Sequence, residues 1–160
     1  SIGHALSNAI GIALAQRWTG KSYTTFCMMG DGEMQEGQVW EAALFAAQNR
    51  MGNLIAIVDR NGYQLDGKVD DVMAIEPLDQ KWAAFGWQVH EVDGHDIAAV
   101  TELMRRLRAD DTRDRPALVI SKTVKGKGVS YMETEPGWHL GWLDPEDADA
   151  AIAEIKAQVI

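Results

Sequence analysis

Residues 23–32 read Tyr-Thr-Thr-Phe-Cys-Met-Met-Gly-Asp-Gly, and this stretch indicates how the chain folds. The β-rich run over 23–29 predicts a strand that ends at the Gly-Asp-Gly turn. Apolar residues at helical spacing then predict a helix over 39–48. Residues 53–58 read Asn-Leu-Ile-Ala-Ile-Val, a nearly continuous apolar run that is typical of parallel strands buried on both faces. The order strand, loop, helix, strand therefore predicts a parallel sheet.

The rest of the chain continues this alternation. Ile2, Leu6 and Ile10 recur every four positions and predict a helix at the start of the sequence. Because that pattern begins directly after Ser1, we expect the domain to be truncated at its amino end. Further patterns predict strands over 87–92 and 117–121 and helices over 77–85, 97–107 and 146–159. Strands that alternate with helices predict an α/β fold, a right-handed parallel β-sheet with helices on both faces, which binds ligands at the carboxyl ends of its strands.

Composition and charge favour some classes of protein and disfavour others. The 160 residues are 46% hydrophobic and 24% charged, which predicts one globular domain over residues 1–160. A net charge of -9 disfavours nucleic acid and anionic membranes as partners, and no apolar run approaches the roughly 18 residues of a membrane span. The single cysteine, Cys27, lies in an apolar run and is expected to be a small buried side chain. These features predict a cytoplasmic protein.

Polar residues follow two of the predicted strands. The Asp31 carboxylate and the Asn61 amide oxygen are hard oxygen donors, which suit Mg²⁺ or Ca²⁺. Gly30 and Gly32 let the backbone turn sharply and approach a ligand. The N–H groups of Gly32 and Glu33, near the start of the next helix, could donate to a phosphate oxygen. A metal that bridges to a diphosphate fits these loops, which we expect outside the sheet core; the alternative is that both are ordinary turns.

Two motifs and their flanks resemble a known family. Residues 30–37, Gly-Asp-Gly-Glu-Met-Gln-Glu-Gly, with residues 59–67, Asp-Arg-Asn-Gly-Tyr-Gln-Leu-Asp-Gly, resemble the thiamine diphosphate motif of transketolases. Residues 1–11 and 122–128, and the pair Trp138-His139, resemble flanking segments of the same family. The resemblance covers essentially the whole chain and is greatest to the amino-terminal subunit of split transketolases. It implies the thiamine diphosphate-binding fold, with thiamine diphosphate and Mg²⁺ as cofactors.

The resemblance also implies roles for individual residues. Asp31 and the Asn61 side chain would bind Mg²⁺, with the backbone carbonyl of Tyr63 as the third protein ligand. Ile2 and Leu65 would pack on the cofactor. Independently of the resemblance, the turn of Gly30, Gly32 and Glu33 is expected beside a bound diphosphate.

Three further positions match the family less closely. His139 matches a catalytic histidine that contacts the diphosphate and lines the substrate channel, although the family commonly has His-Gly where this chain reads His-Leu-Gly. Glu36 matches a glutamate at the subunit interface, and its alternative is a solvated carboxylate at a helix start. His4 stands where many transketolases carry Gln. The roles of Glu36 and His4 therefore stay open.

The resemblance implies half of an active site. In the family, the glutamate that activates the aminopyrimidine ring belongs to a pyrimidine-binding domain, so the implied partner is such a domain or a carboxy-terminal transketolase subunit. The implied reaction moves a two-carbon ketol unit between sugar phosphates. The implied assembly is a homodimer or heterotetramer that buries the helix over 37–50, with Trp40 either in the core or at the interface. Alternatives are 1-deoxyxylulose-5-phosphate synthase, a 2-oxo acid dehydrogenase-type subunit, or a catalytically silent assembly subunit.

Overall fold

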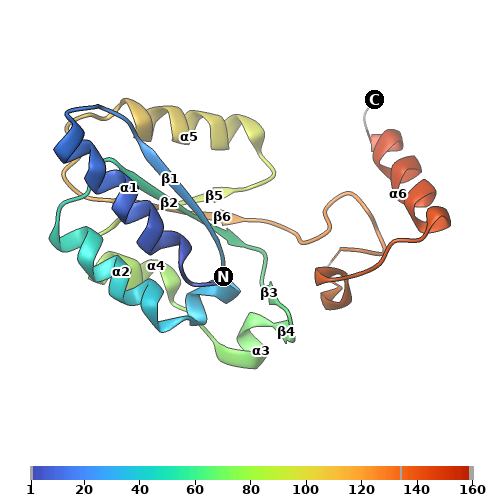
Figure 1. Ribbon diagram of the computed structural model, residues 1–160. Coiled ribbons are helices and arrows are strands. Elements are labelled where there is room, and N and C mark those ends of the chain that lie inside the picture. Colours follow the sequence, from blue (N-terminus) through green and yellow to red (C-terminus); the bar gives the residue numbers. More distant parts are fainter. Residues whose placement is uncertain (1, 134, 159–160) are drawn as a thin grey trace.

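The computed structural model describes residues 2–133 and 135–158 and contains a four-stranded parallel sheet (Figure 1). The strand order across the sheet is β1 (Thr25–Gly30), β2 (Leu54–Arg60), β6 (Ala117–Lys122) and β5 (Gln88–Asp93). The register pairs Gly30 with Asp59 and Asp59 with Ser121. The carboxyl ends of β1, β2 and β6 therefore meet at one edge of the sheet, as the sequence predicts.

Helices cover both faces of the sheet, which confirms the predicted α/β architecture (Figure 1). On one face, Leu6, Val39 and Trp82 form a core with the sheet, and they come from α1 (Ala5–Thr19), α2 (Gly37–Gln48) and α4 (Leu78–Ala84). On the other face, Leu103 and Leu107 of α5 (Ile97–Ala109) pack on β2 and β6. The i, i+3 and i+4 spacing of apolar residues accounts for both contacts, because it places them on one side of each helix.

Cys27 is a core residue, as predicted. Only 5% of it is exposed, on the face of β1 that α1 and α2 cover. Burial, followed by the nearby negative charge of Glu33, raises the pKa of the thiol to about 11. The thiol is therefore neutral near pH 7 and serves as an apolar side chain.

The first helix begins later than its apolar pattern suggests. It starts at Ala5, because Gly3 adopts a φ of +81°, a conformation that a helix does not contain. A Cβ at position 3 would also lie 2.9 Å from Cβ of Glu36, so the chain closely approaches the start of α2 here. The predicted terminal helix is α6 (Pro145–Gln158), and residue 159 lies outside the described residues.

Short elements extend from the carboxyl edge of the sheet. A hairpin of β3 (Tyr63–Gln64) and β4 (Gly67–Lys68) leads into α3 (Val69–Met73). Two 3-10 helices, η1 (Gly32–Gln35) and η2 (Pro136–His139), were not predicted. In Figure 1, α6 lies apart from the sheet, and Ser130 and Tyr131 hydrogen-bond to it at Glu154 and Asp147. None of the helices in the described part of the chain has the length and apolar character that crossing a membrane requires.

The core around Trp82 generates a test of the fold. Trp82 is 0% exposed and packs edge-on against Trp87, with ring centroids 4.7 Å apart. We expect Trp82→Ala to lower the free energy of unfolding by about 3–5 kcal/mol, because it leaves a large cavity. Trp18→Ala is the matched control, because Trp18 is 81% exposed, and its effect should stay within about 0.5 kcal/mol. Urea unfolding followed by circular dichroism measures both, and equal effects would contradict this packing.

Candidate functional site

The site is built around Asp31, which follows β1 and is fully buried. Its Oδ1 accepts a hydrogen bond from the Gly32 N–H at 2.8 Å. Its Oδ2 accepts from the Gly62 N–H at 2.6 Å and from Arg60 Nη1 at 2.9 Å. A carboxylate offers about four acceptor positions, so these three bonds leave one on Oδ1 among the described residues. The expectation that this loop lies outside the core is therefore wrong for Asp31. The hydrogen bonds and the guanidinium just described compensate its buried negative charge.

Arg60 supplies the compensating charge. Its guanidinium lies between Asp31 and Glu76, with Nε 2.9 Å from Glu76 Oε1. Burial lowers the pKa of Arg60, but its hydrogen bonds with the two carboxylates outweigh burial and raise it. Burial likewise raises the pKa of Glu76, and hydrogen bonds from the Leu78 N–H and from Arg60 lower it overall. The role of Arg60 was not predicted from the sequence, although Arg60 directly precedes Asn61. The positions of residues along the chain do not show which carboxylate an arginine pairs with.

The loop after β2 carries the other two expected metal ligands. Asn61 Nδ2 donates to Asp59 Oδ2, and the Tyr63 N–H donates to Asn61 Oδ1, both at 2.9 Å. Gly62, between them, takes a φ of +82° and donates its N–H to Asp31. Asp31, Asn61 and Tyr63 therefore lie in two loops that one hydrogen bond joins directly, as the strand-end rule predicts.

Gly32 brings the same loops together from the other side. A Cβ at position 32 would lie 2.6 Å from Cβ of Gln64, the residue after Tyr63. The glycine thus permits close contact between η1 and β3. Its N–H donates to Asp31 in this structure, and its expected contact with a phosphate stays a prediction.

The Glu33 side chain has a structural role that the sequence did not reveal. Its Oε1 accepts from the Gly3 N–H at 2.8 Å, and its Oε2 accepts from the Gly30 N–H at 3.4 Å. Glu33 thereby fastens the segment before α1 to the end of β1. Ile2 and Leu65, which neighbour Gly3 and Gln64, are 62% and 53% exposed. Their apolar side chains are available to a ligand at this edge.

His139, Glu36 and His4 lie around the same edge. His139 ends η2 and is exposed, and η2 contacts β3, so residues 136–139 come next to the Tyr63 loop despite their distance in sequence. Glu36 is partly buried at the start of α2, against Gly3. The His4 Nδ1 is 3.0 Å from the Ile2 carbonyl oxygen. The structure gathers all three near the candidate site, and their functions stay predictions.

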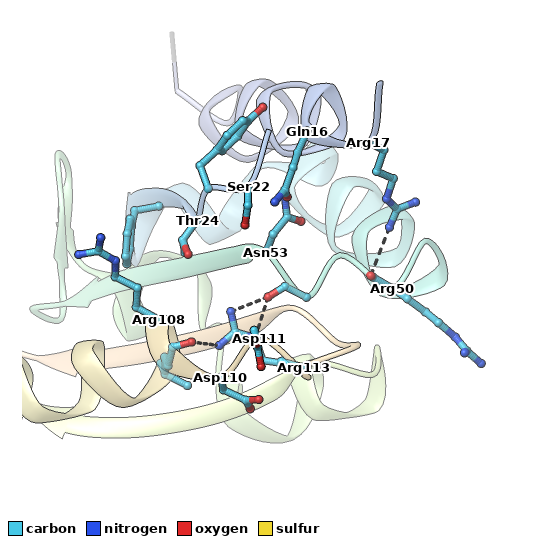
Figure 2. A pocket seen from close by; sticks show the side chains of 14 residues that line it. Gln16, Arg17, Ser22, Thr24, Arg50, Asn53, Arg108, Asp110, Asp111 and Arg113 are labelled. Atoms are coloured by element: carbon cyan, nitrogen blue, oxygen red, sulfur yellow. Dashed lines mark hydrogen bonds between the residues drawn. The ribbon is translucent and has the colours of Figure 1, made fainter. Parts of the chain in front are cut away.

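Two cavities help to locate ligand binding. A cavity of about 340 Å³ adjoins the site, and Asn61, Gly62 and Glu91 contribute to its lining. A larger cavity of about 730 Å³ lies at the opposite edge, where the chain enters β2 (Figure 2). There Arg113 donates to the carbonyls of Gly52 and Leu107 at 2.9 and 2.7 Å, so its guanidinium holds two loops together. Gln16 and Asn53 bring side-chain amides to the larger cavity as well. Among the described residues, the combination of a buried carboxylate, Asp31, with the amide oxygen of Asn61 lies at the first edge.

The donor set at this edge fits Mg²⁺. Within the described residues, no three His, Cys, Asp or Glu side chains gather as a metal cluster. One carboxylate, one amide oxygen and one backbone carbonyl are nevertheless hard oxygen ligands, and Mg²⁺ takes its remaining ligands from phosphates and water. Both Asp31 Oδ1 and Asn61 Oδ1 keep an acceptor position beyond the hydrogen bonds described above.

Comparison with known proteins identifies the family. The family described as transketolase, thiamine diphosphate binding domain, matches residues 1–157. The chain belongs to this family. It is 40% identical over 159 residues to an apulose-4-phosphate transketolase subunit of Phocaeicola vulgatus, covering 99% of this chain and 56% of that protein. It is 38% identical over 158 residues to the 6-deoxy-6-sulfo-D-fructose transketolase subunit SqwG of a Clostridium species, covering 99% and 57%.

A solved structure of the same family shares the fold. The transketolase from Campylobacter jejuni superposes with a TM-score of 0.79 at 26% identity, covering 98% of this chain and 24% of that one. This transketolase-family chain thus spans a little over half the length of the two relatives above and about a quarter of the solved enzyme. The family and fold that the sequence predicts are confirmed.

The Arg60–Asp31 pair provides a test of the site in this transketolase-family chain. We expect Arg60→Met to lower the free energy of unfolding by about 3 kcal/mol, because it leaves a buried carboxylate without its counter-charge. Arg105→Met is the matched control: Arg105 pairs with Glu102, and both side chains are more than 70% exposed, so the loss should be below about 1 kcal/mol. Urea unfolding at pH 7 compares the two. A cost for Arg60→Met no larger than the control would contradict the buried pair.

Proposed function

We propose that this chain is the diphosphate-binding half of a thiamine diphosphate- and Mg²⁺-dependent transketolase that transfers a two-carbon ketol unit between sugar phosphates. The observation that carries the proposal is the buried Asp31 carboxylate, hydrogen-bonded to the Asn61–Tyr63 loop at the carboxyl edge of the sheet. The family match over residues 1–157 supports it, as do two relatives named as transketolase subunits.

The proposed metal ligands are Asp31, Asn61 and the Tyr63 carbonyl. When bound, Mg²⁺ would neutralise diphosphate charge and supply its bridge to the protein. Asp31 is suited to this part because the Gly32 and Gly62 N–H groups fix both of its oxygens. Gly32 permits the two ligand loops to lie close together, because a side chain at this position would meet Gln64.

The remaining site residues would orient the cofactor and substrate. Gly30, Gly32 and Glu33 form the turn beside the proposed diphosphate position. The two glycines lack side chains, so the backbone of this turn could approach the diphosphate closely. The exposed apolar side chains of Ile2 and Leu65 would pack on the cofactor. Thiamine diphosphate itself supplies the carbanion chemistry of ketol transfer. His139, on the helix next to β3, is the proposed catalytic residue that contacts the diphosphate and lines the substrate channel.

A partner would complete the site. The aminopyrimidine ring would meet a pyrimidine-binding domain, either in a carboxy-terminal subunit or in another part of the same enzyme. We place the contact on α2, because Leu44 and Phe45 are 53% and 47% exposed there. Trp40 on the same helix packs against Trp82 and Phe85, so core packing explains it. The proposed assembly contains at least two copies of this domain, as a homodimer or heterotetramer in the cytoplasm, with residues 1–160 as one diphosphate-binding domain.

Reconstitution tests the proposal. The chain, a pyrimidine-domain subunit, thiamine diphosphate and Mg²⁺, supplied with a ketose phosphate donor and an aldose phosphate acceptor, should convert the donor to an aldose phosphate two carbons shorter and the acceptor to a ketose phosphate two carbons longer. Omission of any component should abolish this turnover. Asp31→Asn keeps the side-chain shape but removes the charge, so activity and calorimetric cofactor affinity should fall by more than about a hundredfold. Asp111→Asn, an exposed change at the opposite edge, is the control and should leave both unchanged.

Two results would contradict the proposal. The first is ketol transfer by the repurified chain alone at a rate proportional to its own concentration. The second is a folded Asp31→Asn assembly with wild-type cofactor affinity.

A further inference from the structure

Asp59 occupies a central place in the candidate site although it is not one of the expected metal ligands. It lies near the end of β2 and is partly buried. Its Oδ1 accepts a hydrogen bond from the Thr123 hydroxyl, and its Oδ2 accepts from Asn61 Nδ2 at 2.9 Å. Asp59 thus connects the loop after β6 to the loop that carries Asn61.

This connection fixes which end of the Asn61 amide faces the metal position. An ionised carboxylate only accepts hydrogen bonds, so the NH₂ group of Asn61 must face Asp59. The amide oxygen then lies on the other side, where it accepts from the Tyr63 N–H at 2.9 Å. A flipped amide would place its oxygen against the carboxylate and its NH₂ group against the Tyr63 N–H. Both contacts would be repulsive, so the two neighbours select one orientation.

Thr123 holds Asp59 in the position that this selection requires. The parallel register pairs Asp59 with Ser121, and the Thr123 N–H donates to the Arg60 carbonyl at 3.3 Å. The sheet therefore places the Thr123 backbone so that the hydroxyl reaches Asp59. The next residue is also fixed, because the Val124 N–H donates to His95 Nε2 at 2.8 Å. The hydroxyl is thus presented to Asp59 by a rigid segment.

We propose that Asp59 and Thr123 are positioning residues that keep the Asn61 oxygen, rather than its nitrogen, aimed at the Mg²⁺ site. The inference rests on the proposed function, since it concerns the metal that would hold the diphosphate. It gives residues 122–128, which resemble a transketolase segment, a physical role at the metal loop. Mg²⁺ accepts an amide oxygen but not an amide nitrogen as a ligand. If the Asn61 amide is free to flip, Mg²⁺ should therefore bind more weakly, although all three proposed ligand residues are still present.

The experiment measures metal dependence rather than turnover. The chain assembled with a pyrimidine-domain subunit is titrated with thiamine diphosphate by calorimetry at a series of Mg²⁺ concentrations. Thr123→Val should raise the Mg²⁺ concentration for half-maximal binding by about tenfold to hundredfold, the usual effect of losing an orienting partner. Asp59→Asn should do the same, because an amide can face Asn61 with either end. Thr123→Ser keeps the hydroxyl and should restore the wild-type value.

A matched control separates orientation from general destabilisation. The Thr112 hydroxyl donates to Asp110 at 2.8 Å, a threonine–aspartate hydrogen bond within an exposed turn at the opposite edge of the sheet. Thr112→Val should leave the Mg²⁺ dependence unchanged. Thermal unfolding followed by circular dichroism checks that each variant folds. If Thr123→Val does not fold, Asp59→Asn tests the same positioning role independently.

The outcomes distinguish this inference from the proposed function. Wild-type Mg²⁺ dependence in folded Thr123→Val or Asp59→Asn would overturn the positioning role and leave the proposed function standing. An equal loss in Thr123→Ser and Thr123→Val would also overturn it, because shape rather than the hydroxyl would then matter. A wild-type assembly that binds no thiamine diphosphate at any Mg²⁺ concentration would overturn both.

Discussion

The Asp31 carboxylate lies in the protein interior with 0% of the residue exposed, and a buried charge is costly unless protein groups replace its water. Three groups do so, the N–H groups of Gly32 and Gly62 and the guanidinium of Arg60. Gly32 follows β1, whereas the other two come at the end of β2. The need to compensate one charge therefore fixes the loops of two neighbouring strands relative to each other.

The network around this charge extends along the carboxyl edge of the sheet. Arg60 reaches Glu76, which precedes α4, so the covering helix is tied to the same carboxylate. Asp59 reaches Thr123 after β6. Glu33 fastens the segment before α1 to the end of β1. Segments from five parts of the sequence are thus preorganised around one site, which lowers the cost of ordering them when a ligand binds.

Periodicity predicts much of this fold, because the apolar spacing of strands and helices reflects which faces become buried. The strand-end rule also brings Asp31 and Asn61 together from the sequence. It does not indicate that Asp31 is buried, that Arg60 pairs with it, or that Glu33 acts through its side chain. These features depend on contacts between residues about 30 positions apart, which a local pattern does not encode. Gly3 delays the first helix for the same reason, because Glu36 packs against it.

The assignment of Asp31, Asn61 and Tyr63 as metal ligands can be tested by a crystal structure of the assembled enzyme with thiamine diphosphate and Mn²⁺ in place of Mg²⁺. Anomalous scattering at the manganese edge locates the metal independently of any assumed position. We expect a single strong anomalous peak within coordination distance of the Asp31 carboxylate, the Asn61 amide oxygen and the Tyr63 carbonyl, with the diphosphate completing the coordination. A metal and diphosphate bound elsewhere, with these three groups still bonded only to protein, would contradict it.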